Sequence, residues 1–412
     1  MGLAAVVAHT ARRLAMTFLN QAERIAPELI ALRRTLHAEP ELMLDLPRTQ
    51  ATVLAALEGL DLEIATGRGL SSVVAVLRGG RPGPAVLLRG DMDALPIREA
   101  NVLEFAATNG RMHACGHDLH TAGLVGAARL LHERREELPG SVVFMFQPGE
   151  EGAGGARIML EEGLLEEQPV AAYAVHVDCG EALGVWSTRP GPLMASSSVM
   201  YLRLSGTGGH AAMPHGGVDP VPVAAEMILA IQAFVTRRIP VQDPAVISVT
   251  RLASNSLARN VIPGEIEIDL NIRTLSPQTL SYVRTELPAM LTALAAVHRC
   301  SLEAEFVGNY PVTVNDPAET AQVLEWLGDL HGPGQVELLD TPGMASEDFS
   351  YVLEKVPGAM VFLGVRPPQT SVNEPPAMHS ATAVFDDSLL GQQAATLAEL
   401  AWRRLRKASH PV

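Results

Sequence analysis

Four short apolar runs, rich in β-branched and aromatic residues and close to Gly or Pro, most constrain how this chain can fold. They cover residues 73–77, 85–89, 142–146 and 171–177. Runs of this kind favour strands that are buried on both faces. A segment with helical character, residues 119–138, separates the second run from the third. Strand, helix and strand in this order predict an α/β fold, with a mostly parallel sheet covered by helices.

The pattern changes near Pro192. Residues 199–205 and 265–273 alternate polar and apolar side chains, which is the period of strands with one face in water. Helical segments at 220–237 and 277–297 lie among these strands. This part of the chain is therefore predicted to be an α+β unit built on an antiparallel sheet.

The chain is too long for one ordinary core, because it has 412 residues. Alternation of helices and strands resumes after residue 308. The simplest organisation is a discontinuous larger domain, 16–191 and 309–412, into which a smaller domain, 192–308, is inserted. Residues 1–15 are expected to be an N-terminal extension.

Composition argues against several classes of partner. The chain has 31 Lys and Arg against 46 Asp and Glu, which gives a net charge of −15. Nucleic acid and anionic membranes both need a basic face, so neither is expected as a partner. No stretch approaches the ~20 apolar residues of a transmembrane helix. Three scattered cysteines are too few for a disulfide framework, and a reducing cytoplasm is the expected location.

The densest chemical motif is MHACGHDLH, residues 112–120, with three His, one Cys and one Asp. Cys115 and His117 are ligand types that suit Zn, Mn, Co or Ni. Gly116 between them permits a tight loop, so that both side chains could converge on one ion. A single histidine would more often be an ordinary core residue, but this cluster favours a metal site over an incidental polar loop.

Two adjacent carboxylates, Glu150 and Glu151, follow the third apolar run in the stretch FQPGEEGAGG. One of such a pair can bind a metal, while the other acts as general base on a water beside it. Taken alone, the stretch could equally be a solvated turn. Its glycines fit neither a P-loop, because no Lys-Ser/Thr follows, nor a dinucleotide fingerprint.

Further candidates lie near the ends of the same predicted strands. Asp91 and Asp93 follow the second run, His176 lies in the fourth, and His379 lies in a Pro-rich loop. Each is weak alone, because a histidine in an apolar run is more often a core residue. In an open α/β sheet, however, sites gather at the carboxyl ends of the strands. The set as a whole is an inventory for two metal ions and a base.

Six motifs follow one another in a fixed order between about residues 30 and 390. They are LHAEPEL (36–42), RGDMDALP (89–96), MHACGHD (112–118), QPGEEG (147–152), GGHAAMPH (208–215) and SEDF (346–349). Together they resemble the amidohydrolase branch of the M20 metallopeptidases. That branch holds N-acyl-amino-acid hydrolases, hippurate hydrolases, auxin-conjugate hydrolases and N-acetyldiaminopimelate deacetylases.

The resemblance implies a metallo-exopeptidase-like catalytic domain that binds two divalent metal ions per subunit. Mn or Zn is favoured, with Co and Ni as alternatives. The residues that match the family's metal ligands are Cys115, His117, Glu151, His176 and His379. Glu150 matches the general base, and Asp91 and Asp93 are expected to support the ligands. Glycine at position 149, where Ala is more usual, is expected to loosen the loop that carries Glu150.

The inserted domain is implied to be a lid that often forms the dimer interface, so a homodimer or homotetramer is expected. His210 matches a lid histidine that, in related enzymes, reaches the partner subunit's active site and stabilises the oxyanion. Asn260 and Arg273 lie where contacts to a substrate carboxylate could arise.

These inferences predict metal-dependent hydrolysis of the amide bond of N-acyl amino acids, with a small acyl amino acid or short peptide as substrate. Glu150 would activate the water, and a carboxylic acid and a free amino acid would be released. A dipeptidase or carboxypeptidase on the same scaffold is the main alternative. A non-catalytic metal-binding homologue is less favoured, because Glu150 is retained beside Glu151.

Overall fold

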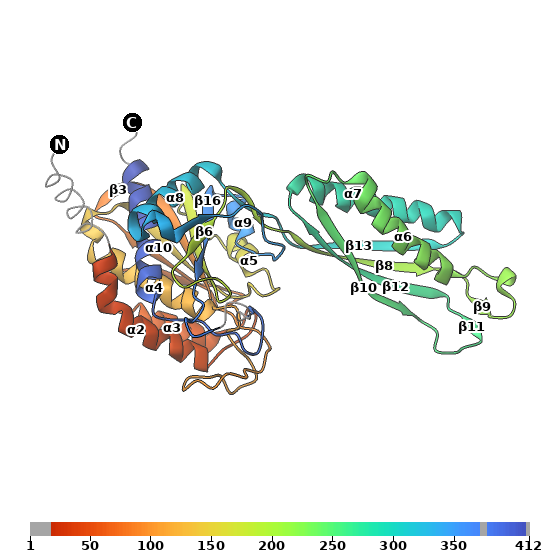
Figure 1. Ribbon diagram of the computed structural model, residues 1–412, viewed down its shortest axis with the longest axis horizontal. Coiled ribbons are helices and arrows are strands. Elements are labelled where there is room, and N and C mark those ends of the chain that lie inside the picture. Colours follow the sequence, from red (N-terminus) through yellow and green to blue (C-terminus); the bar gives the residue numbers. More distant parts are fainter. Residues whose placement is uncertain (1–17, 371–376, 409–412) are drawn as a thin grey trace. The chain divides into compact units, whose positions relative to one another are not determined.

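The computed structural model describes residues 18–370 and 377–408 (Figure 1). The expected N-terminal extension, 1–15, lies outside the described residues. Contacts divide the chain into two compact units, of which the second comprises Pro192–Thr313 and Thr341–Ser350. Residues 309–313 and 341–350, which the sequence pattern placed in the larger domain, therefore pack with the second unit.

An eight-stranded sheet forms the centre of the first unit (Figure 1). Its strands, in spatial order, are β1 (Glu63–Thr66), β2 (Val73–Arg78), β4 (Pro139–Gln147), β3 (Arg81–Asp91), β5 (Ala171–Asp178), β16 (Gly358–Gly364), β6 (Trp186–Thr188) and β15 (Val336–Leu338). The four central strands β4, β3, β5 and β16 run parallel. Strands β1, β2 and β6 are antiparallel to their inner neighbours. The predicted α/β fold with a mainly parallel sheet is confirmed.

Helices of the first unit accompany this sheet, and several pack directly on it. They are α2 (Leu19–Ala38), α3 (Pro47–Ala56), α4 (His117–Glu133), α5 (Gly155–Glu161), α8 (Pro317–His331), α9 (Ser350–Leu353) and α10 (Leu390–Ala408), with α9 beginning at the unit boundary. Helices α2, α4 and α10 contact one another, and α4 and α10 also contact β3. Helix α8 packs against β16, β15 and β6. Because β3 and β4 are covered in this way, their predicted apolar runs are fully buried.

The second unit is an antiparallel sheet with two helices. The sheet has the order β10 (Ala245–Ser254), β12 (Glu265–Thr274), β8 (Ser197–Ser205) and β13 (Ser301–Tyr310). Along β12 every second side chain is buried, as its alternating sequence predicts. Two further short strands, β9 (Gly209–His210) and β11 (Val261–Ile262), pair as a small antiparallel ribbon. In the sequence, β9 follows β8 and β11 precedes β12. Short strands β7 (Gly191–Met194) and β14 (Thr313–Asn315) lie where the chain passes between units.

Both helices of the second unit begin with a proline, and the side chain of the preceding residue caps the helix. In α6 (Pro220–Arg238), the side chain of Asp219 accepts the Val221 N–H, and in α7 (Pro277–Val297) Ser276 accepts the Thr279 N–H. A proline in the first turn costs no hydrogen bond, because its N–H would have no partner there. Helix α6 is long and apolar enough to cross a membrane by length and composition, but it packs on β10, β12 and β8.

A buried ion pair joins three distant segments of the first unit. Glu319 of α8 accepts hydrogen bonds from Tyr173 Oη at 2.5 Å and from Arg404 Nε at 2.9 Å. Burial, followed by the Glu319 charge, raises the pKa of Tyr173, so its hydroxyl stays protonated and donates. The pair therefore ties β5, on which His176 lies, to α8 and α10.

Replacement of Glu319 tests this tie. Glu319→Ala should lower the free energy of unfolding by about 3–5 kcal/mol, because it leaves a largely buried guanidinium and a buried hydroxyl without their acceptor. Urea denaturation would measure the loss. Glu161→Ala, which removes an exposed pair with Arg157, should cost only about 0.3–0.5 kcal/mol. Equal losses in the two variants would contradict the assignment.

Candidate metal centre

Five side chains predicted as metal ligands come together in the first unit. They form two groups that share Cys115. The first group is Cys115, His117 and His176, and the second is Cys115, Glu151 and His379. In each group, the candidate ligand atoms all lie within 4.8 Å of one another. A sulfur common to both groups could bridge two ions, which is an arrangement that the sequence motifs alone did not define.

The strand ends explain why these residues meet. In the parallel register Asp91, the last residue of β3, lies beside Gln147, the last residue of β4. The loop after β4 begins there and carries Glu150 and Glu151. His176 lies near the end of β5, which is parallel to β3. The carboxyl ends of parallel strands thus meet at one edge of the sheet, where sites of open α/β proteins form.

The two buried histidines of the first group are held in one tautomer. His117 Nδ1 is 2.8 Å from the carbonyl oxygen of Asp93, and His176 Nδ1 is 2.7 Å from that of Val177. A carbonyl oxygen only accepts, so Nδ1 carries a proton in both rings, and in the neutral form of each ring the lone pair is on Nε2. His117 Nε2 is buried and has no hydrogen-bond partner within residues 18–370 and 377–408. This is the tautomer that a metal ligand needs.

Cys115 lies at the centre of the two groups. Its Sγ is 3.6 Å from His176 Nε2 and 3.2 Å from His379 Nε2. Burial raises the pKa of this thiol, but His117 and His176 outweigh burial and bring it down to about 6. The thiolate, which is the ligating form of cysteine, is therefore accessible near neutral pH. Thiolate, imidazole and carboxylate donors together fit divalent ions such as Zn, Mn, Co and Ni.

His379 completes the second group from a separate loop. Its Nε2 is 3.2 Å from Glu151 Oε1, and its backbone N–H donates to the Ala114 carbonyl at 2.9 Å. The hydrogen bond with Cys115, then that with Glu151, raises its pKa to about 10. Its backbone φ is +60°, in the left-handed region that non-glycine residues rarely adopt. Such strained positions are concentrated at functional sites.

One carboxylate holds the backbone of both glutamates. Asp93 Oδ1 accepts the Glu150 N–H and Asp93 Oδ2 accepts the Glu151 N–H, each at 3.0 Å. The carbonyl oxygen of the same residue faces His117. Asp93 therefore fixes the general-base candidate and two candidate ligands, one from each group. Its supporting role at the metal centre stays a prediction.

Two glycines adopt backbone conformations that the ligand loops require. Gly116 has φ +84° and precedes α4, and a Cβ there would lie 2.3 Å from Val177 Cγ2. Gly149 has φ +77°, and a Cβ there would lie 2.5 Å from Leu44 Cδ2. That Gly149 loosens the loop stays a prediction. Glycine is the residue that this left-handed turn favours, and the turn is held by Asp93.

Asp91 and His120 form a buried layer behind the first group. Asp91 Oδ2 is 3.4 Å from His117 Nε2 and 2.8 Å from Arg89 Nη1. Its other oxygen, Oδ1, is 2.5 Å from His120 Nδ1. His120 belongs to the predicted histidine-rich motif, but no role followed from the sequence, because hydrogen-bond partners cannot be inferred from spacing.

The other predicted site residues lie in the second unit. His210 is exposed on β9, and Ala212 N–H donates to its Nδ1 at 3.1 Å, so in the neutral ring Nε2 carries the proton. Asn260 is exposed next to β11. Arg273 on β12 has a buried Nη1 without a hydrogen-bond partner in the described part of the chain. Burial lowers the pKa of this guanidinium.

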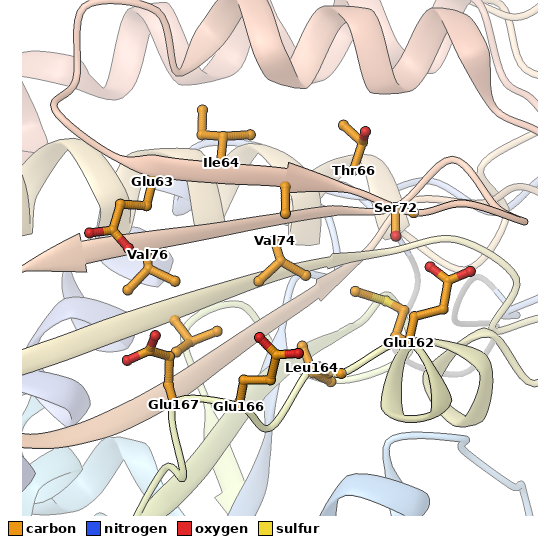
Figure 2. A pocket seen from close by; sticks show the side chains of 15 residues that line it. Glu63, Ile64, Thr66, Ser72, Val74, Val76, Glu162, Leu164, Glu166 and Glu167 are labelled. Atoms are coloured by element: carbon orange, nitrogen blue, oxygen red, sulfur yellow. The ribbon is translucent and has the colours of Figure 1, made fainter.

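A hollow of about 270 Å³ beside β1 and β2 is a different feature from the metal centre (Figure 2). Figure 2 shows Val74 and Val76 between Glu63 on one side and Glu166 and Glu167 on the other. Glu63 and Glu167 pair with Arg78, and Glu162 accepts the backbone N–H groups of Arg68 and Gly69. These carboxylates are therefore engaged in local structure.

Comparison with known proteins gives the family. A family model described as peptidase family M20/M25/M40 matches residues 87–403. The chain belongs to this family. An IAA-amino acid hydrolase of Arabidopsis thaliana, ILR1-like 4, is 36% identical over 384 residues, which are 92% of this chain and 86% of the relative. Thermostable carboxypeptidase 2 of Saccharolobus solfataricus is 34% identical over 376 residues, which are 90% and 94%.

A solved structure supports the same assignment. The YXEP protein of Bacillus subtilis, described as a dinuclear metal binding peptidase from the M20 family, matches with a TM-score of 0.80 and 31% identity. The match covers 93% of this chain and 99% of that protein. The predictions of an M20 fold and of a hydrolytic enzyme are confirmed.

Exchange of Asp93 tests how the M20 centre is held. Asp93→Asn turns an amide N–H₂ toward one of two backbone N–H groups and so displaces Glu150 or Glu151. Metal affinity should fall about 10–100-fold, as measured by equilibrium dialysis. Asp316→Asn is the control for the same exchange at the start of α8, where Oδ1 of Asp316 accepts two successive backbone N–H groups and an Asn keeps that oxygen. Equal metal affinity in the two variants would contradict the role of Asp93.

Proposed function

We propose that the protein is a metal-dependent amidohydrolase that cleaves the amide bond of N-acyl amino acids and releases a carboxylic acid and a free amino acid. The observation that carries this proposal is the pair of ligand groups around Cys115, with Glu150 adjacent in sequence to Glu151. Support also comes from the Arabidopsis relative, which by its name hydrolyses an amino-acid conjugate.

Two divalent ions per subunit, one in each ligand group, are the proposed cofactors, with Mn or Zn favoured. Ions held by Cys115, His117, His176, Glu151 and His379 would lower the pKa of a water and polarise the carbonyl under attack. The preset histidine tautomers and the low pKa of the Cys115 thiol support this assignment.

Glu150 is proposed as the general base. Its side chain is 6% exposed, and its backbone is fixed by Asp93. From this position the carboxylate takes a proton from the attacking water and returns it to the nitrogen of the leaving amine. Because Asp93 holds the successive N–H groups of Glu150 and Glu151, the spacing between the base and the neighbouring ligand is set before substrate binds.

Residues of the second unit are proposed to act on the substrate. His210 presents an Nε2–H donor in its neutral form, which suits a developing oxyanion. The Nη1 of Arg273, which has no hydrogen-bond partner among the described residues, suits a substrate carboxylate, and Asn260 is a further candidate for this contact. An acidic protein can bind an anionic substrate in this way, because a single guanidinium supplies the local charge.

Hydrolysis of short peptides is the second candidate function. The 34% identity to a carboxypeptidase favours it, and the same ligands and base would serve a peptide bond. The two functions differ only in the group on the acyl side of the bond that is cleaved.

Assembly and location are proposed from the surface. Helix α6 exposes Val221 and Leu229, the latter with 71% of its area accessible, and these apolar residues support a homodimer or homotetramer through the second unit. Cys115, Cys179 and Cys300 are all free thiols, which supports a cytoplasmic location.

A substrate panel tests the function directly. Protein stripped with a chelator should release no amine, and added Mn²⁺ or Zn²⁺ should restore release from N-acyl amino acids. The reason is that the attacking water needs the ions to lower its pKa. A ninhydrin or coupled amine assay would measure it. Release from dipeptides alone would select the second candidate. No release from either class, with two ions bound, would contradict both.

Exchange of Glu150 separates the base from the ligands. Glu150→Gln should lower kcat about 10²–10⁴-fold, because the amide cannot take the proton, while the protein still binds its metal ions. Steady-state kinetics and elemental analysis of the same sample provide the two readouts. Glu166→Gln, at the hollow of Figure 2, is the control and should leave both unchanged. A parallel loss of metal would show that Glu150 is a ligand.

A further inference from the structure

His120 lies between the two histidines of the first ligand group. It follows His117 by one helical turn of α4 and is 1% exposed. Its ring centroid is 4.5 Å from that of His176 and 5.4 Å from that of His117, while the two ligand rings are 6.1 Å apart. The ring therefore fills the space behind both candidate ligands.

Both ring nitrogens of His120 are already used. Nδ1 is 2.5 Å from Asp91 Oδ1, and Nε2 accepts the backbone N–H of Val177 at 2.9 Å. The N–H of Val177 can only donate, so Nε2 is unprotonated, and Nδ1 carries the proton that Asp91 accepts. His120 is thus excluded as a ligand, although its ring lies within ligand distance of Asp91 and His117.

The two hydrogen bonds act on different sides of the first group. The bond to Val177 fixes the residue that follows His176 and whose carbonyl oxygen accepts from His176 Nδ1. The bond to Asp91 fixes the carboxylate whose other oxygen is 3.4 Å from His117 Nε2. That oxygen is also paired with Arg89 Nη1, and Arg89 Nε donates to Gln147 at 2.9 Å.

We propose that His120 is a positioning residue that sets the spacing of His117 and His176 and so fixes the affinity of the first metal site alone. The proposal rests on the two-ion centre proposed above. Glu151 and His379 receive neither of the two hydrogen bonds described for His120. Loss of His120 therefore weakens the first site about 10–100-fold, the usual effect of removing a hydrogen-bond partner behind a metal ligand, and leaves the second site intact.

Two substitutions divide the hydrogen bonds between them. His120→Asn places an amide N–H₂ near the position of Nδ1, so it keeps the bond to Asp91 and loses the acceptor for Val177. His120→Gln places an amide oxygen near the position of Nε2, so it keeps the bond to Val177 and loses that to Asp91. His132→Gln is the matched control. His132 lies on the same helix and its Nε2 also accepts a backbone N–H, that of Asp61 at 3.3 Å.

The experiment measures how many Co²⁺ ions the full-length protein binds and with what affinity. Equilibrium dialysis and the absorption spectrum of the protein provide the two readouts. Wild type and His132→Gln should each bind two ions, and the affinities should be the same in the two proteins. Both His120 variants should retain one tight ion, with the sulfur-to-cobalt band of Cys115 preserved, and bind the other about 10–100-fold more weakly.

Three results would overturn the proposal. They are wild-type binding of both ions in the His120 variants, an equal loss at both sites, and loss of the native circular dichroism spectrum in both variants, which would make His120 a residue of the core. A wild-type protein that binds no Co²⁺ would overturn the two-ion centre as well, so the two failures are distinguishable.

Discussion

The rest of the site depends on the parallel register of β3, β4 and β5. Because Asp91 at the end of β3 lies beside Gln147 at the end of β4, the loops that follow start at the same level of the sheet. A slip of one residue would turn each of these side chains to the opposite face. The buried apolar runs of the strands make such a slip costly, so the hydrophobic core sets the positions of the polar residues above it.

The polar residues are then fixed by hydrogen bonds that need no metal. Carbonyl oxygens of Asp93 and Val177 select the tautomers of His117 and His176, and the carboxylate of Asp93 holds the loop of Glu150. A centre prepared in this way loses little conformational entropy when ions bind. The arrangement lowers the stability of the metal-free protein, because a thiol, several imidazoles and carboxylates must be buried close together.

Much of this could be predicted from the sequence, and the limit has a physical cause. Apolar runs revealed β2, β3, β4 and β5, and the alternation of β12 revealed a sheet with one wet face. The edge strands β10 and β13 were not predicted, because their exposed positions weaken the period-2 pattern. Residue types suggested ligands, and the fold brings all five together, although their roles remain predictions. The Cys115 bridge and the bonds of His120 depend on three-dimensional contacts between separate segments, which spacing does not encode.

The shared sulfur gives the centre a consequence that separate sites would lack. Cys115 belongs to both ligand groups, so one thiolate charge would serve both proposed ions. The carboxylates around this sulfur would have to supply the rest of the negative charge that two buried divalent ions require. Asp91 is paired with Arg89, which reduces its contribution to that charge. The candidate ligand atoms of Glu150 and Glu151 lie within 4.8 Å of that of His117, so these two carboxylates would supply such charge, which gives a physical reason for two adjacent acids in this loop.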